Sequence, residues 1–429
     1  MTSMTLIIVL IVLFFVLMFT GMPIGIAIGA SSIVTLLLQG SLPSIVAPQR
    51  VFVMLDSFSL MAVPLFILSG EIMARGGIAQ RLIRFSSVLV GHIRGSHAQI
   101  TIISSMFFAS VSGSASASCS AIGSIMVPSM VEEKYDKDYA VAVLACASTL
   151  GPIIPPSIMM VIYGSMTSVS VGQMFIGGVI PGLMFVVGLM GLSYYFAARR
   201  KYAVHRRSSL KEVWVAFKEA IWALIMPVII LGGILSGVFT PTEAGAVACL
   251  YAFIVGFATG NIKIGDLKTI FYKAAVSTTI PMFIIGIAAI FGWLLTINNF
   301  PQLMGGVLHN ITRNPNVFFA IILGFYLIIG LFMESNAALI IMVPVLAPMA
   351  ASYGIDPVHF GVVTVIALLI GAITPPVGIL LFISTSLAKA KIGDVMRLVW
   401  PYCILLSILT LIFAMFPPIV TWLPKLVLR

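Results

Sequence analysis

The stretch GPIIPPS at residues 151–157 cannot form a continuous helix, although it lies in the middle of a long apolar segment. Two adjacent prolines remove two backbone N–H donors, and their rings clash with the carbonyl groups of the preceding turn. We therefore expect residues 139–168 to form two half-helices with a break between them. GAITPPVG at residues 371–378 repeats the device inside the apolar segment 358–388. Each break would free carbonyl groups and helix ends for a binding site, and a structural kink without a site is the alternative.

The composition places these breaks in a membrane. Of the 429 residues, 60% are hydrophobic and 8% are charged, whereas soluble domains carry about 25% charged residues. The mean hydropathy is +1.17. Lipid must be the solvent for so apolar a chain, and runs near the roughly 20 residues that cross a bilayer recur throughout. We expect one all-α integral membrane unit. The expected spans lie at about 5–20, 23–39, 58–74, 139–168, 172–198, 219–239, 241–260, 277–297, 358–388 and 398–420.

Two further apolar segments are too rich in small or polar residues at their centres to be simple spans. They cover residues 98–131 and 317–349, and each precedes a broken helix. We interpret both as re-entrant hairpins. Residues 43–57 and 262–275 mix apolar and charged positions, which predicts interfacial amphipathic arm helices.

The two halves of the chain repeat one another. Five features recur in the same order at offsets between 216 and 220 residues, which indicates an internal duplication. The matched pairs are Pro23 and Pro241, VPLFIL (63–68) and IPMFII (280–285), IMVP (125–128) and IMVP (341–344), GPIIPP (151–156) and GAITPP (371–376), and Pro181 and Pro401. Each half holds five spans, an odd number. The second copy is therefore expected to lie upside down relative to the first, as in inverted-topology transporters.

The basic residues predict how the chain is oriented. With the N-terminus outside, 19 of the 23 Lys and Arg residues fall in inside loops. The four that fall outside are Arg50, Arg313, Lys425 and Arg429. Because inside loops carry the excess of positive charge in membrane proteins, both termini are expected on the outer side. The net charge of +10 thus reports orientation and does not indicate nucleic-acid binding.

The tips of the predicted hairpins carry the polar groups. SVSGSASAS at 110–118 places serines and a glycine at the first tip. Hydroxyl and carbonyl oxygens are hard ligands that suit a cation such as Na⁺, and close helix packing through small residues is the alternative. Glu334 is an ionisable residue at the second tip, and such residues are functional by default. Its carboxylate could bind a cation, couple protons or cap backbone amides.

Other acidic residues and the cysteines have plainer interpretations. Glu71 ends a span near Arg75 and is expected to form an interfacial ion pair with it. Glu243 follows Pro241 and is expected to cap a helix locally. The four cysteines stand singly and read as small buried residues. The histidines show no metal-ligand spacing, the start of the chain does not resemble a cleaved signal peptide, and no GxSxG, HExxH or Walker A motif occurs.

At this point the motifs match a known family. The chain resembles the large membrane subunit, of the DctM or SiaM type, of tripartite ATP-independent periplasmic (TRAP) transporters. The matching motifs cover nearly the whole chain and are VPLFILSGEIM (63–73), SGSASA (112–117), GPIIPPS (151–157), FTPTEAGAVA (239–248), the run 332–348 and ITPPVG (373–378). The family commonly has aspartate where Glu334 stands here.

The resemblance implies Na⁺-driven uptake of a carboxylate, such as sialic acid or a C4-dicarboxylate, across a bacterial inner membrane. A periplasmic binding protein would deliver the substrate, and a separate small subunit of four spans would complete the membrane complex. By the family's likeness to elevator transporters, the hairpins and broken helices would move past a scaffold. The expected units are 1–95 and 201–316 as scaffold with arm helices, and 96–200 and 317–429 as the two transport halves.

At least two Na⁺ sites are expected. The first would use Ser112 and Ser114 with the backbone of Gly151, Ile154 and Pro156. The second would use Ser335, Asn336, Gly371 and Thr374. Further candidates for substrate binding or coupling are Ser116, Pro155, Ser157, Glu334 and Pro375.

Other functions remain open at this point. The main alternative is a self-sufficient divalent-anion/Na⁺ symporter of related architecture. An intramembrane enzyme would need a nucleophile–base pair or a metal cluster, which the sequence does not offer, and a passive channel would not concentrate its substrate. The sequence does not name the substrate.

Overall fold

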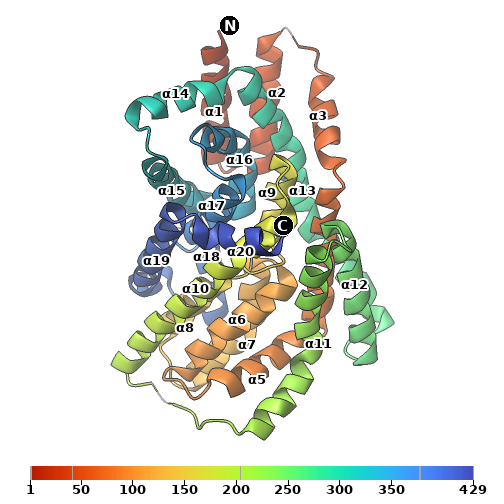
Figure 1. Cartoon of the computed structure of the whole chain (residues 1–429), viewed down its shortest axis with the longest axis vertical. Coiled ribbons are helices and arrows are strands. Elements are labelled where there is room, and N and C mark those ends of the chain that lie inside the picture. Colours follow the sequence, from red (N-terminus) through yellow and green to blue (C-terminus); the bar gives the residue numbers. More distant parts are fainter. Residues whose placement is uncertain (1, 41, 203, 376–377, 429) are drawn as a thin grey trace.

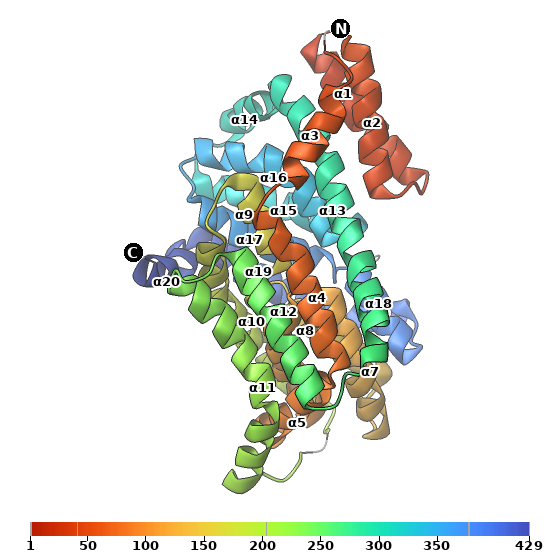
Figure 2. The same cartoon turned by 90° about the vertical axis from the view of Figure 1, so that its right-hand side faces the viewer.

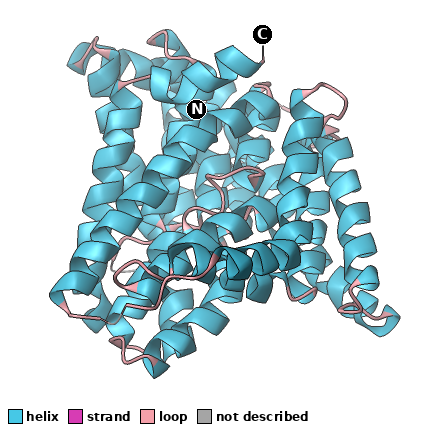
Figure 3. Cartoon of the chain, turned by 60° about the horizontal axis from the view of Figure 1, so that its bottom comes forward, coloured by secondary structure: helices cyan, strands magenta, loops and turns pink. Residues whose placement is uncertain are grey.

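The chain folds into helices joined by short loops. A computed structural model describes residues 2–40, 42–202, 204–375 and 378–428, and within these ranges every regular element is helical. Figure 3 shows this all-helical build. Pro376, the last residue of the repeated GAITPP motif, lies outside the described residues, as does Arg429 of the outside loops. The predicted class, an all-α integral membrane protein, is confirmed.

The helices fall into two series, one for each half of the chain. The first series is α1 (Ser3–Phe19), α2 (Ile24–Gln39), α3 (Val46–Leu55), α4 (Ala62–Arg75), α5 (Ile78–Val90), α6 (Ser96–Ser112), α7 (Ala115–Glu132), α8 (Lys137–Ser148), α9 (Ile158–Thr167) and α10 (Val171–Arg199). The second is α11 (Leu210–Leu235), α12 (Pro241–Ala258), α13 (Leu267–Ile297), α14 (Phe300–Ile311), α15 (Pro315–Phe332), α16 (Ser335–Ser352), α17 (Pro357–Gly371), α18 (Ile379–Ala388) and α19 (Ile392–Met415). The helix α20 (Pro418–Val427) follows as an addition.

Local chemistry explains where the central helices begin and end. α6 ends at Gly113, whose φ of +61° is readily adopted by glycine alone. The side chains of Ser114, Ser157 and Glu334 accept hydrogen bonds from the first turns of α7, α9 and α16. Such N-caps satisfy amide groups that a helix leaves free at its start. The pairs α6–α7 and α15–α16 are therefore two hairpins, each turned by two residues.

The hairpins and broken helices of the two series pack against one another. α7 of the first hairpin lies against α18, and α16 of the second lies against α9. In the same way α8 packs on α19 and α17 on α10. α4, α12 and α13 form a second group beside this body, with α1 and α2 beyond it, next to α13 (Figures 1 and 2). The site of interest lies inside the first group, where the two series meet.

Helix lengths agree only partly with the expected spans. Seven described helices are long and apolar enough to cross a membrane, or eight if the bent pair α3–α4 is counted as one span. They include both arms of the second hairpin, α15 and α16, whereas α1 and α2 are shorter, with 17 and 16 residues. Each half of a broken helix is also too short alone, because the break interrupts it.

The arm predicted at residues 262–275 does not form a separate helix. A short 3-10 turn at Ile264–Asp266 leads directly into α13, which continues for 31 residues to Ile297. Lys268 and Lys273, whose charges prompted the prediction, are both exposed, so they fit on one long helix. The arm predicted at 43–57 does form a separate helix, α3, which turns by 63° into the segment that holds α4.

Two of the acidic residues can now be placed. Glu243 forms a capping box with Thr240 at the start of α12, as predicted. The expected ion pair between Glu71 and Arg75 does not form, because the Arg75 guanidinium instead bonds Asp266 across to the second half at 2.7 Å. The Glu71 carboxylate makes no ion pair with any described residue.

Candidate functional site

The tip of the first hairpin is a cluster of hydroxyl groups. The Ser112 side chain is 4% exposed, and its Oγ lies 3.3 Å from the Ser118 Oγ. The Ser114 Oγ caps α7 and lies 3.1 Å from the Ser116 Oγ. These contacts leave oxygen lone pairs free, which makes the tip suited to a hard cation or to a substrate that donates hydrogen bonds.

The first break packs directly on this tip, backbone against backbone. A methyl group added at Gly151 would lie 2.8 Å from the Ser114 carbonyl oxygen, and one added at Gly113 would lie 2.7 Å from the Pro156 carbonyl oxygen. Glycine is thus required on both sides of the contact. Among the described residues, the carbonyl groups of residues 151–156 accept no hydrogen bond. Buried carbonyls are normally paired, so these six oxygens are candidate ion ligands.

The tip of the second hairpin is built around a carboxylate. One oxygen of Glu334 accepts the backbone N–H of Ala337 at 3.0 Å, and the other accepts the side-chain N–H of Asn336 at 2.7 Å. Of the roles that the sequence left open for Glu334, the capping of backbone amides is therefore present in the structure. The Asn336 Oδ1 is buried without a partner among the described residues. An orphan buried oxygen beside a carboxylate suits a cation, because either group alone would be costly to bury.

The second break supports this tip from behind. Gly330 and Gly371 touch backbone to backbone, since a methyl group at Gly371 would lie 2.5 Å from the Gly330 Cα. Ser335 lies against the same helix, with its Oγ 3.4 Å from the Leu368 carbonyl oxygen. Thr374 is buried and donates to the Ile370 carbonyl at 2.7 Å, which leaves its lone pairs available.

The fold brings the two tips together around one cavity of about 200 Å³. Ser114 and Ser116 line it from the first hairpin, and Glu334, Ser335 and Asn336 line it from the second. These residues stand about 220 positions apart in the sequence, and only the crossed packing of the halves joins them.

The other predicted site residues lie behind this cavity. Among these predicted residues, Ser112 lines the neighbouring cleft. Those that line neither space are Gly151, Ile154, Pro155, Pro156, Ser157, Gly371, Thr374 and Pro375. Ser157 is fully buried and caps α9 through the Met160 N–H at 3.2 Å. Its hydroxyl group therefore stabilises the start of α9 at the break.

A larger cleft of about 710 Å³ adjoins the cavity between α4, α7 and α13. Glu334, Asn336, Ser114 and Ser116 line both spaces. From there Ser116, Ser120 and Ser124 form a ladder along α7, four residues apart, which places them on one helix face. Glu71, Arg75, Lys273 and Ser277 line other parts of the cleft.

Sequence reasoning missed most of these cleft residues. The spacing of the three serines could have revealed the polar face of α7. Lys273 gave no such signal, because nothing in the sequence places α13 opposite α7. Glu71 was assigned to an ion pair, although an ionisable residue inside an apolar helix indicates a functional surface in a membrane protein.

Two hairpin tips and two broken helices that meet at one buried polar cavity define a membrane protein with the architecture of secondary transporters. The family model described as the DctM component of tripartite ATP-independent periplasmic transporters matches residues 11–419. The chain therefore belongs to the DctM family, the large permease components of TRAP transporters.

Several relatives are similar over most of their length. The sialic acid TRAP transporter large permease SiaM of Vibrio cholerae is 37% identical, in an alignment that covers 92% of this chain and 93% of the SiaM chain. The C4-dicarboxylate large permease DctM of Pseudomonas aeruginosa is 38% identical over 93% and 94%. The isethionate permease DctMQ of Oleidesulfovibrio alaskensis is 38% identical over 91% of this chain, which spans 62% of that longer protein.

A solved structure supports the fold. The crystal structure of the Alcanivorax borkumensis YdaH transporter matches with a TM-score of 0.58 and 14% identity, covering 82% of this chain and 84% of that one. At this identity the likeness concerns the arrangement of helices alone.

Proposed function

We propose that this chain is the large membrane subunit of a Na⁺-driven importer of organic acids in a bacterial inner membrane. The observation that carries the proposal is the cavity where the two hairpin tips meet. It joins hydroxyl groups, a carboxylate and an amide oxygen that has no partner among the described residues, and carbonyl groups that accept no hydrogen bond from those residues lie just behind it. Hard oxygen ligands of this kind suit Na⁺. A bound cation would in turn attract the carboxylate of a substrate.

The sizes of the two spaces support a division of labour. The inner cavity, about 200 Å³, lies below the roughly 300–1,000 Å³ of ordinary ligand pockets, so it suits ions and one acid group. The body of an organic acid would occupy the adjoining cleft, about 710 Å³, against the serine ladder of α7. The names of the relatives differ in substrate, and we leave the acid itself unspecified.

The proposed transport cycle moves the hairpins and broken helices past α4, α12 and α13. Arg75 and Lys273, which line the cleft, belong to the predicted inside residues. The conformation described here would therefore be the one that opens to the cytoplasm, with both termini periplasmic. A cysteine at Arg313 should react with an impermeant maleimide in intact spheroplasts, and a cysteine at Arg206 should not. The reverse pattern would reject this orientation.

The proposal includes two partners, a periplasmic binding protein that delivers the substrate and a small four-span membrane subunit. Proteoliposomes with a Na⁺ gradient test this directly. The large subunit alone, with each partner, and with both partners should be compared with an empty-liposome control. Uptake is expected only with all three proteins. Strong Na⁺-driven uptake by this chain alone would reject the tripartite function in favour of a self-sufficient symporter.

A further inference from the structure

The segment that connects the two halves of the chain is unusually basic. Residues 199–218 run from the end of α10 into α11 and contain seven of the 23 Lys and Arg residues of the protein, against one acidic residue, Glu212. Excess positive charge beside a membrane helix attracts anionic headgroups. It also follows from orientation alone, so the structural context must decide whether a site exists.

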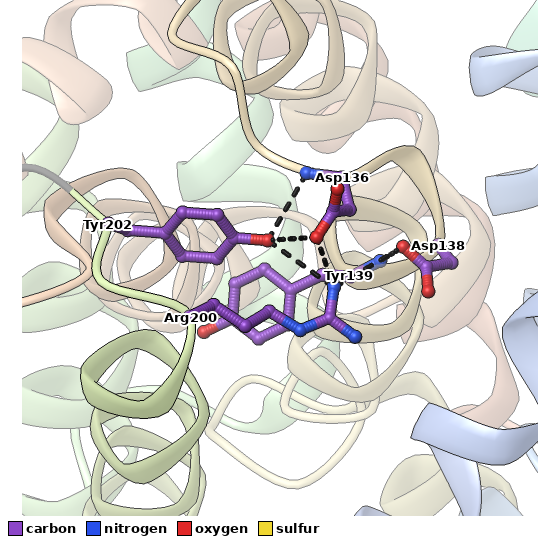
Figure 4. Close-up of polar contacts among 5 residues, drawn as sticks. All are labelled: Asp136, Asp138, Tyr139, Arg200 and Tyr202. Atoms are coloured by element: carbon purple, nitrogen blue, oxygen red, sulfur yellow. Dashed lines mark hydrogen bonds and ion pairs between the residues drawn. The ribbon is translucent and has the colours of Figure 1, made fainter.

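Part of this connection is fastened to the base of the first hairpin (Figure 4). Arg200 pairs with Asp136 and lies 3.5 Å from Asp138. The Tyr202 hydroxyl donates to the Asp136 carboxylate at 2.7 Å. Burial raises the pKa of this phenol, which keeps its proton in place for the bond. The His205 Nδ1 lies 2.7 Å from the Ser96 Oγ.

This clasp leaves the remaining basic side chains facing outward. Six of them are exposed and form no ion pair within the described residues, namely Arg199, Lys201, Arg206, Arg207, Lys211 and Lys218. The one acidic residue is occupied, because the Glu212 carboxylate accepts the Ser209 backbone N–H at 2.6 Å. The surface of the connection is therefore positively charged, and the bonds of Arg200, Tyr202 and His205 hold the connection against the base of the first hairpin.

The start of α11 continues this surface with an exposed stripe of lysine and tryptophan. Lys211, Trp214, Lys218 and Trp222 follow one another at intervals of three, four and four residues, so they share one face of the helix. Trp214 and Trp222 are 57% and 47% exposed, whereas Ala216, Ala220 and Ala223 on the other side are buried. The Lys218 Nζ lies 5.4 Å from the Trp214 ring centre. Tryptophan and lysine at a helix end are typical of the headgroup level of a bilayer.

We propose that the basic connection and the α11 stripe together form a binding site for anionic phospholipid headgroups. Phosphate groups would pair with Arg206, Arg207 and Lys211, and the lipid body would lie along Trp214. The site would hold the connection between the two halves at the membrane surface. Only the assignment of this site to the cytoplasmic leaflet rests on the proposed orientation. The binding of headgroups itself does not depend on which side of a symmetric bilayer the site faces.

The test uses the purified full chain, delipidated in a zwitterionic detergent, with phosphatidylglycerol, phosphatidylcholine or inorganic phosphate added back. The variant replaces Arg206, Arg207 and Lys211 by glutamine. The matched control replaces Lys389, Lys391 and Arg397, three exposed basic residues that are also predicted inside. Thermal unfolding and the amount of phosphatidylglycerol retained per protein are the two measurements.

Phosphatidylglycerol is expected to raise the melting temperature of the native chain and of the control by several degrees, and the triple variant should lose most of this gain and about half of the retained lipid. Phosphatidylcholine and phosphate should have little effect.

Equal responses of the triple variant and the control would overturn the proposal and leave only the general excess of basic residues in inside loops. An equal gain with inorganic phosphate would also overturn it in favour of a free-anion site. A protein partner is indicated instead if no lipid responds and the purified small subunit protects the stripe from labelling. Labelling of a cysteine at Arg206 from outside would reject the orientation while leaving headgroup binding intact.

Discussion

The first hairpin, α6–α7, and the second, α15–α16, occupy the same place in the two series of helices but meet the rest of the chain differently. The second arm of the first hairpin, α7, faces the open cleft with its serine ladder. The second arm of the other, α16, packs on α13, where a methyl group at Gly292 would lie 3.1 Å from Pro344. The tips differ as well, because Ser114 caps one hairpin and the Glu334 carboxylate caps the other.

The sequence predicts that the two hairpins are copies of one element, and their tips and surroundings now differ in chemistry. The first tip supplies neutral hydroxyl groups that line the cleft, and the second supplies the carboxyl group of the shared cavity. In the conformation described here, one hairpin arm lines the cleft and the other is covered by a neighbouring helix. If α7 became covered and α16 came to line a cleft, the site would face the opposite side of the membrane.

The largest expected effect comes from removing the charge of the second tip. Glu334→Gln keeps the size and one acceptor oxygen but loses the carboxylate. Charge-assisted hydrogen bonds are worth about 1.5–3 kcal/mol, so Na⁺-driven uptake in proteoliposomes should fall by about a hundredfold at the upper end. Glu334→Asp, which keeps the charge, should retain part of the activity. Normal uptake by Glu334→Gln would mean that the side chain only caps α16.

The next effect concerns the backbone contact behind the second tip. A methyl group in Gly330→Ala would lie 2.7 Å from the Gly371 Cα, and backbone atoms cannot swing away. Overpacking of this kind costs about 1–3 kcal/mol, so the melting temperature of the purified chain should fall by several degrees. Gly324→Ala on the same helix, with nothing within 4 Å, is the control and should not destabilise. If the two variants melt alike, the close approach of hairpin and broken helix is wrong.

A smaller effect is expected when a neutral ligand is removed from either half. Ser112→Ala and Thr374→Ala should each raise the Na⁺ concentration for half-maximal uptake about fivefold, since one hydrogen-bond-sized interaction of about 1 kcal/mol is lost. Ser110→Ala is the control, because Ser110 lies within the regular helix α6 and lines neither the cleft nor the cavity. An unchanged Na⁺ dependence in both variants would remove these residues from the ion sites.

The smallest effect separates the cleft from the cavity. Lys273 lines the cleft but is exposed, and solvent screens an exposed charge, which limits its contribution to about 1 kcal/mol or less. Lys273→Gln should weaken the apparent substrate affinity by about twofold to threefold, with the Na⁺ requirement unchanged. Lys268, on the same helix, does not line the cleft, so Lys268→Gln should have no effect. If both variants lose substrate affinity equally, the lysines act by orienting α13 in the membrane and not by lining a substrate path.

Much of the fold and part of the site follow from local sequence. The proline pairs predicted the breaks, and the glycine–serine run predicted the first tip, because both act through the backbone within a few residues. The arm predicted at 262–275 is not a separate helix, for the opposite reason. Its charged residues are compatible with one long helix, and only the packing of α13 decides between the two forms. The partner of Arg75 also depends on the fold. Glu71 is near it in the sequence, but the fold places Asp266, which is distant in the sequence, within ion-pair distance.

The sequence by itself determined that the chain is a helical membrane protein with a duplicated device of hairpin and broken helix, since composition and proline chemistry act locally. Only the tertiary structure decided which oxygens share a cavity. Glu334 lines the same cavity as Ser114 and Ser116 because α7 packs on α18 and α16 on α9. Such contacts between residues about 220 positions apart depend on glycine-sized gaps at Gly151 and Gly371 that accept another backbone, and a linear sequence does not say which backbone fills them.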